Sequence, residues 1–310
     1  MINYFKLISS NSANLGQMQI EEILAQLENN TNEFPRLALE RAIEERETIT
    51  SILIEILDKL SNNLEELLEK SDYILHIHAL YLLAQFREVA AYPTIIKFFS
   101  VPGDVALDVT GDIVTEDLCR ILASVSGSNI EPIKQLIENP EANEYVRGAA
   151  LEALLVLIAQ EVLTREQVIQ YYAKLFSTLD KEDYYIQTTL VTNSAQLCAV
   201  ELQEQIDRAF EEELVDLFFI DQEDVSTYLV VERKEALNRL CNNTKYSFIK
   251  DIILEMESWS CFQPQEREPS YNIFIPEGFS LGTSETSKNK ARDKKKMQKQ
   301  SRRKNRSKKK

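Results

Sequence analysis

Tyr145-Val146-Arg147-Gly148-Ala149-Ala150-Leu151-Glu152-Ala153-Leu154 is the stretch of the chain that decides its fold class. Small residues are followed by large apolar ones at helical spacing, so a neighbouring helix can approach closely and pack against them. A similar pattern lies 71 residues earlier, where the matched pairs are Ala79 with Ala150, Leu80 with Leu151 and Leu83 with Leu154. The stretch is therefore part of a repeat.

Two further copies extend this repeat. Leu83-Ala84 corresponds to Leu122-Ala123, 39 residues later, and Ala149-Ala150 corresponds to Thr189-Leu190, 40 residues later. Offsets of this size are typical of HEAT and armadillo repeats, in which helix pairs stack because one pair alone cannot bury its apolar face. We expect an all-α, HEAT/armadillo-like α-solenoid over residues 15–262.

The composition also favours a helical array. The chain has 310 residues, more than one compact core usually spans, and 44% of them are hydrophobic. Seven glycines and eight prolines are too few for the many tight turns of an all-β protein. Apolar residues recur three and four positions apart, as between Ile20 and Leu27, which is the pattern of an amphipathic helix.

Several residue types mark where helices begin. A polar residue followed three positions later by Glu or Gln forms a capping box, and proline is tolerated in the first helical turn. The capping-box candidates are Asn63 with Glu66 and Thr164 with Gln167, and the prolines are Pro35, Pro93 and Pro132.

The sequence carries no signal that predicts secretion or membrane crossing. Met1 to Lys6 lead into a polar stretch without the apolar run of a signal peptide. The most apolar helix, 148–159, is shorter than the roughly 20 residues that span a bilayer. No CxxC pair occurs, so we interpret the cysteines as small core residues in a reducing, cytoplasmic compartment; they are Cys119, Cys198, Cys241 and Cys261.

Charge divides the chain into two parts. Residues 288–310 contain 14 Lys and Arg and one acid, whereas the rest contains 21 basic and 49 acidic residues. The basic segment has too few apolar residues to offset chain entropy, so we expect a disordered tail. We assign residues 1–14 to an N-terminal extension and residues 263–287 to a proline-containing linker. The residues expected to bind a polyanion are Lys294, Lys295, Lys296, Lys299, Arg302, Arg303, Lys304, Arg306, Lys308, Lys309 and Lys310.

A dense cationic run of this kind gains affinity for polyanions by releasing condensed counterions. RNA, the ribosome or an acidic protein is therefore the expected partner of the tail. Two alternatives stay open: the tail only increases solubility, or it acts in cis on the acidic body as a regulatory segment. Membrane attachment is not expected, because no lipidation signal accompanies the charge.

His76 and His78 are the only histidines in the chain. Residues two positions apart on a helix point about 200° apart, so these rings cannot bind one metal ion. We expect one of them at a helix contact and the other in solvent.

The segment from Asp104 to Asp117 is rich in acidic residues but lacks the spacing of a calcium loop. Asp112 and Thr115 are expected to cap the helix that carries Leu118. If the array has a functional edge, this loop between repeats is the first place to look, because insertions between repeats map to one face.

No motif indicates an enzyme. The chain has no glycine-rich phosphate loop and no nucleophile elbow, and its acids occur in blocks such as Glu211-Glu212-Glu213 that are typical of a solvated helix face. We therefore expect no catalytic residues, no cofactor and no metal.

Two segments carry a resemblance to known families. The stretch from Tyr145 to Leu154 resembles the "VRxxAAxAL" signature of HEAT-like repeats, including those of phycobilin lyase subunits. Residues 15–262, with the segment from Gly111 to Leu118, resemble an uncharacterised bacterial domain-of-unknown-function family of HEAT-like proteins. Relatives in that family often end in a SEC-C zinc-binding tail, but no cysteine follows Cys261 here, so the resemblance implies no zinc site.

These observations favour a non-catalytic scaffold or adaptor. Its helical body would bind an unknown protein partner, and its tail would contact a polyanion. The resemblance to phycobilin lyases implies an alternative, a chaperone-like lyase or accessory, which would co-purify with a coloured tetrapyrrole. Fold alone does not decide between them.

Overall fold

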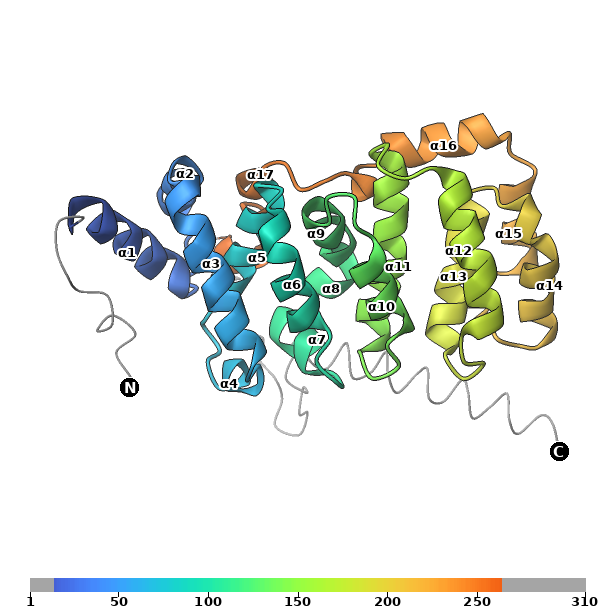
Figure 1. Ribbon diagram of the computed structural model, residues 1–310, viewed down its shortest axis with the longest axis horizontal. Helices are drawn as coiled ribbons and strands as arrows, with labels where there is room; N and C mark the ends of the chain where they lie inside the picture. The colour runs from blue at the N-terminus through green and yellow to red at the C-terminus, as the bar shows by residue number, and fades with distance from the viewer. Residues whose placement is uncertain (1–13, 264–310) are drawn as a thin grey trace, which may run out of the picture. The chain divides into compact units, whose positions relative to one another are not determined.

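The computed structural model describes residues 14–263 and is all-α over that range (Figure 1). It contains no β-strand in the described residues, only two isolated bridges. The α-helices are α1 Asn14–Glu28, α2 Arg36–Glu44, α3 Arg46–Ser61, α4 Glu65–Leu68, α5 Leu75–Gln85, α6 Tyr92–Phe99, α7 Val105–Thr110, α8 Ile113–Glu116, α9 Leu118–Val125, α10 Glu131–Glu138, α11 Glu144–Ala159, α12 Arg165–Thr178, α13 Tyr184–Gln196, α14 Gln203–Glu211, α15 Gln222–Leu229, α16 Arg233–Asn242 and α17 Ile252–Met256. Four short 3-10 helices join them: η2 Val89–Ala91, η3 Val200–Leu202, η4 Thr244–Tyr246 and η5 Ser260–Phe262.

The segments matched in the sequence are the most buried helices. They are α5, α9, α11 and α13, and each packs against the next one in that order. α5 is buried at every position from Leu75 to Ala84, and α9 is buried throughout. Four further helices, α3, α6, α10 and α12, bury one face only. One continuous apolar cluster joins these layers from Ile20 to Phe262.

Three of these buried helices also end alike. Arg87, Glu161 and Cys198 follow α5, α11 and α13 with φ of 54°, 59° and 50°. In each case the next residue donates its N–H to a carbonyl five positions earlier, for example Glu88 to Leu83 at 3.0 Å. This is the Schellman arrangement, which satisfies the free carbonyls of a helix end. The same helix ending therefore recurs along the described residues.

The expected helix starts are confirmed in part. Thr164 and Gln167 form the capping box of α12, and Pro93 and Pro132 lie in the first turns of α6 and α10. Pro35 stands directly before α2. Asn63 is not a cap, because its amide donates to the Glu66 carboxylate at 2.6 Å and α4 begins at Glu65 without a side-chain cap.

Two other expectations about local structure are wrong. α9 begins after Asp117, so neither Asp112 nor Thr115 caps it, and the Thr115 hydroxyl donates to the Asp112 carbonyl instead. Cys119 and Cys198 are buried as expected, but Cys241 is exposed on α16. No helix within residues 14–263 is long and apolar enough to cross a membrane.

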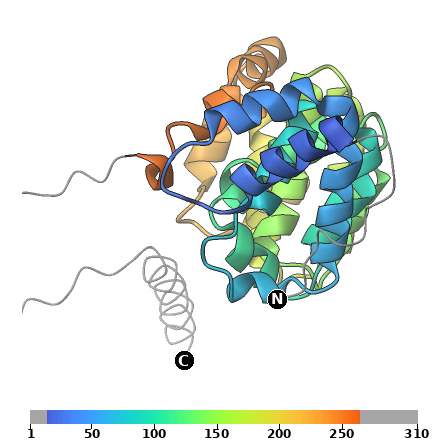
Figure 2. The ribbon, with the colours of Figure 1, turned by 90° about the vertical axis from the view of Figure 1, so that its left-hand side faces the viewer.

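Residues 243–263 turn back along the helices that precede them, and we call them the return segment (Figures 1 and 2). η4 packs on α11, and α17 packs on α5 and α2. Its buried side chains are Tyr246, Phe248, Ile249, Ile252, Met256 and Phe262. Its backbone is bound by Gln160 at Tyr246 O (3.1 Å), Arg120 at Ser247 O (3.0 Å), Ser124 at Ile249 N (3.0 Å) and Gln85 at Ile252 N (2.7 Å).

Arg120 is the strongest anchor of the return segment. Its guanidinium binds both carboxylate oxygens of Glu255, at 2.6 and 2.8 Å, and one oxygen of Asp117 at 2.7 Å. The Tyr81 hydroxyl donates to the other Asp117 oxygen at 2.5 Å. Burial alone would lower the pKa of Arg120, but the hydrogen bonds to Glu255 and Asp117 raise it above its ordinary value. The arginine therefore stays charged and fully bonded.

Candidate protein-interaction edge

Three loops lie side by side at one end of the helices, on the lower side of Figure 1. They are residues 139–145, from the end of α10 into the first turn of α11, residues 179–185, from the end of α12 into the first turn of α13, and residues 211–221, from the last residue of α14 to the start of α15. Tyr185 links them, because its ring contacts Tyr145 at 4.7 Å and Phe219 at 6.4 Å between centroids. An ion pair between Lys181 and Glu212 at 2.6 Å adds a second link. We call these loops the acidic-aromatic edge.

The edge presents large apolar side chains to solvent. Phe218 is 84% exposed and Leu217 is 67% exposed. On either side of them the loop is anchored, because Val215 and Ile220 are buried. The Asp216 carboxylate accepts a hydrogen bond from the Phe218 N–H at 3.0 Å, and the Phe218 ring meets Phe219 edge-on at 5.5 Å. The loop therefore holds Leu217 and Phe218 outward by defined contacts.

The edge is also strongly acidic. Its three loops contain ten acidic residues and one basic residue, Lys181. Arg147 brings a further positive charge beneath the surface, where it is 3% exposed, and binds Asp183 at 2.8 Å. The exposed acids are Glu141, Asp180, Glu182, Glu211, Glu212, Glu213 and Asp221. Apolar and anionic groups thus occupy one surface.

Gly148 leaves room for the Tyr185 ring at the centre of the edge. A Cβ at this position would lie 2.6 Å from the Tyr185 ring, closer than real Cβ contacts allow. The small residue of the repeat pattern therefore admits the Tyr185 side chain between α11 and α13. The sequence motif that indicates close helix packing here supports the aromatic row of the edge.

The two histidines occupy the core, and the expectation that one faces solvent is wrong. His76 binds the Val109 carbonyl and His78 binds the Leu27 carbonyl, each at 2.9 Å. α5 is covered on every side, so opposite faces of this helix are equally buried. Burial lowers the pKa of each histidine to about 4. The rings bind separate helices and do not converge, and no group of three metal-ligating side chains occurs among the described residues.

The acidic segment from Asp104 to Asp117 has structural contacts. Asp104 accepts a hydrogen bond from Asn143 at 2.8 Å, and Asp117 holds Tyr81 and Arg120. Cys119, beside this segment, has a pKa that burial raises to about 12, so its thiol stays protonated. These contacts hold the acidic segment against the surrounding helices.

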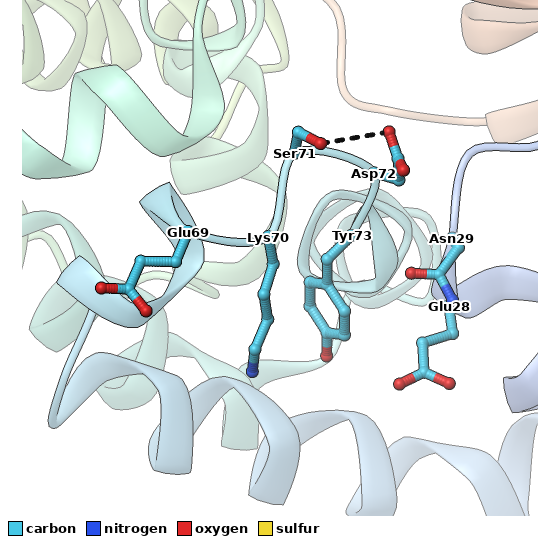
Figure 3. A pocket seen from close by; sticks show the side chains of 7 residues that line it. All are labelled: Glu28, Asn29, Glu69, Lys70, Ser71, Asp72 and Tyr73. Carbon is cyan, nitrogen blue, oxygen red and sulfur yellow. Dashed lines mark hydrogen bonds between the residues drawn. The ribbon is translucent and has the colours of Figure 1, made fainter. Parts of the chain in front are cut away.

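A shallow pocket lies near the other end of the described chain (Figure 3). Its volume is 310 Å³, and its lining is Glu28, Asn29, Glu69, Lys70, Ser71, Asp72 and Tyr73. Lys70 stands over the Tyr73 ring at 5.7 Å, and the Ser71 hydroxyl bonds to Asp72 at 3.3 Å. The pocket is open and polar, without the apolar walls that bury a small ligand.

Sequence reasoning missed the edge. The apolar run from Leu217 to Phe219 stands between acidic residues in the sequence, and that pairing could have indicated an exposed apolar surface. The block Glu211-Glu212-Glu213 is exposed, as expected. The residues expected to bind a polyanion, from Lys294 to Lys310, lie outside the described residues, as do residues 264–287 of the expected linker and most of the N-terminal extension.

Comparison with known proteins places the helical unit in a family. The family described as "Protein of unknown function (DUF1186)" matches residues 18–263. A protein of Chlamydia trachomatis serovar D (strain ATCC VR-885 / DSM 19411 / UW-3/Cx), described as "Uncharacterized protein", is 38% identical over 244 residues, which are 78% of this chain and 96% of that protein. An "Uncharacterized protein" of Chlamydia muridarum (strain MoPn / Nigg) is 37% identical over 244 residues, 78% of this chain and 97% of that protein. No solved structure matches the chain. With the match covering most of its length, the chain belongs to the DUF1186 family of proteins of unknown function.

Proposed function

We propose that this protein is a non-catalytic interaction scaffold, a HEAT-like α-solenoid that binds a protein partner at the acidic-aromatic edge. The order of contacts from α5 to α13 and the shared helix endings support the solenoid. In such arrays the loops between repeats form a continuous row, which is a common place for a binding surface. The free cysteines support a reducing, cytoplasmic location.

The exposure of Phe218 carries the proposal. Burying a phenylalanine side chain stabilises a protein by about 1.5–3 kcal/mol, and this chain leaves Phe218 84% exposed in an anchored loop. Aromatic side chains of this kind supply much of the binding energy of protein interfaces. Folding does not bury Phe218 and Leu217. A partner that covers them would therefore bind with the free energy of burying these two side chains.

A photo-crosslinking residue at position 218 tests the scaffold. In a nuclease-treated lysate of the source cells, we expect a discrete protein crosslink from position 218. The same residue at Leu254, which is 69% exposed on α17, should give none. Identical crosslinks from both positions, or no crosslink from position 218, would count against a docking surface at the edge.

The basic segment is the proposed contact with a polyanion such as RNA. The family model matches residues 18–263, a range that excludes the basic segment. Removing residues 288–310 is therefore expected to leave the fold intact and to reduce RNA binding at least tenfold at 50 mM salt. Filter binding across a salt series measures this. Equal RNA affinity of the full chain and residues 1–287 would contradict RNA binding by the basic segment.

A further inference from the structure

We infer that the partner at the acidic-aromatic edge presents a cationic segment with an aromatic or large aliphatic anchor. The inference rests on the proposed scaffold function and specifies the chemistry of its partner.

The exposed apolar pair determines which partner side chain can anchor at the edge. Leu217 and Phe218 project from one loop, and the aromatic row of Phe219, Tyr185 and Tyr145 continues from them across the two neighbouring loops. A partner side chain that covers this pair must itself be large and apolar, because a polar group placed there would lose its water without gaining a hydrogen bond. Well-packed anchors of this kind dominate interface energies.

The acidic residues around the apolar pair indicate that the partner is positively charged. Ten acids and a single lysine lie in the three loops, and Lys181 is already paired with Glu212. Glu211 is exposed in the same loop as the apolar pair, and Glu182 is exposed in the neighbouring loop that carries Tyr185. At physiological salt the field of these groups extends about 8 Å, which covers the rim of a docked segment. Lys and Arg on the partner match this field, and they also speed its association.

Other occupants fit less well. A second copy of the chain meeting the edge with its own edge would bring the same ten acids and repel it. Nucleic acid and acidic lipid surfaces carry the same sign as the edge. The chain's own basic segment has the right charge, but from Lys288 onward its only apolar residues are Ala291 and Met297, so it lacks the anchor.

Peptide binding to the full chain tests the inference. The probe is a fluorescein-labelled synthetic peptide with six lysines around a Trp-Leu pair, and the matched control peptide has Gly-Ser in place of that pair. Fluorescence anisotropy is read at 50 and 500 mM salt. We expect the control peptide to bind at least tenfold more weakly, because a single interface anchor commonly contributes that much.

Matched variants assign the binding to the edge. Phe218→Ser is expected to weaken the anchored peptide at least tenfold, whereas Leu254→Ser, at a similarly exposed leucine, should leave it unchanged. The pair Glu182→Gln and Glu211→Gln should weaken it about fivefold at 50 mM salt and less at 500 mM salt. Glu33→Gln with Glu47→Gln removes the same charge from an exposed region near α2 and α3 and should have no effect.

The outcomes separate this inference from the scaffold proposal. Equal binding of anchored and control peptides, or equal losses in the edge and control variants, overturns the cationic anchored partner. A crosslink at position 218 without peptide binding leaves the scaffold standing and removes this partner chemistry. Tighter peptide binding by residues 1–287 than by the full chain would assign the edge to the chain's own basic segment and overturn the inference.

Discussion

Replacing Arg120 with alanine is expected to lower the free energy of unfolding by about 3 kcal/mol, the lower end of the range for breaking a buried ion pair. The arginine side chain is 10% exposed, and its removal leaves the carboxylates of Asp117 and Glu255 without their cation. These carboxylates are 19% and 24% exposed, so water relieves part of the loss. Urea unfolding measures the change through Trp259, the only tryptophan, which packs edge-on against Tyr81 in the return segment.

Arg36→Ala provides a matched control for this prediction. Arg36 also binds the return segment, through Glu257, but the two side chains are 48% and 39% exposed. Ion pairs at this exposure contribute about 0–1 kcal/mol, so the control should lose no more than that. An equal decrease in the free energy of unfolding in the two variants would show that the buried contacts of Arg120 stabilise the fold no more than the exposed ion pair of Arg36. Hydrogen exchange should also rise across residues 246–262 in Arg120→Ala and not in the control.

Lowering the pH from 7 to 5 is expected to remove about 2 kcal/mol of stability for each buried histidine. The folded-state pKa of His76 and His78 is about 4, depressed by burial from the ordinary value of 6.5. Below pH 6.5 the unfolded chain binds protons that the folded chain does not bind until about pH 4. Their contribution is therefore complete above pH 6.5 and is lost as the pH falls toward 4.

His76→Gln with His78→Asn isolates this effect. A Gln amide places its N–H near the Nε2 position that faces the Val109 carbonyl, and an Asn amide places its N–H near the Nδ1 position that faces the Leu27 carbonyl. The double variant keeps both donors without a titrating ring, so its urea unfolding free energy should change by less than about 1 kcal/mol between pH 7 and pH 5. Glu201, whose pKa is about 2 because Arg165 binds it, titrates below this window. An unchanged pH slope in the double variant would contradict the assignment.

Local sequence signals predicted much of the helical structure. The Thr164 capping box and the prolines of α6 and α10 act within one helical turn, so their effect is visible in neighbouring residues. The matched segments around Ala79, Leu122 and Ala150 are buried helices in consecutive contact, because a repeated small and apolar pattern marks the faces that pack together.

The predictions were wrong or missing where burial and contacts depend on parts of the chain that are distant in the sequence. Helical periodicity cannot tell whether both faces of α5 are covered, so it placed one histidine in solvent. Nothing near Ser247 in the sequence indicates that its carbonyl meets Arg120, 127 residues earlier. The exposure of Phe218 depends on the buried anchors Val215 and Ile220 and on the neighbouring loop around Tyr185, which only the folded arrangement brings together.

The return segment also affects when the protein can finish folding. Stacked helix pairs contact only their neighbours and can form as synthesis proceeds, but Gln85 binds Ile252, 167 residues later, and Arg36 binds Glu257, 221 residues later. At about 5–20 residues per second, the ribosome needs roughly 10–35 s after α5 to deliver these closing contacts. Until then the apolar surface that Ile252 and Met256 will cover is open to other chains. The nascent protein therefore has a period of aggregation risk that a purely sequential array would avoid.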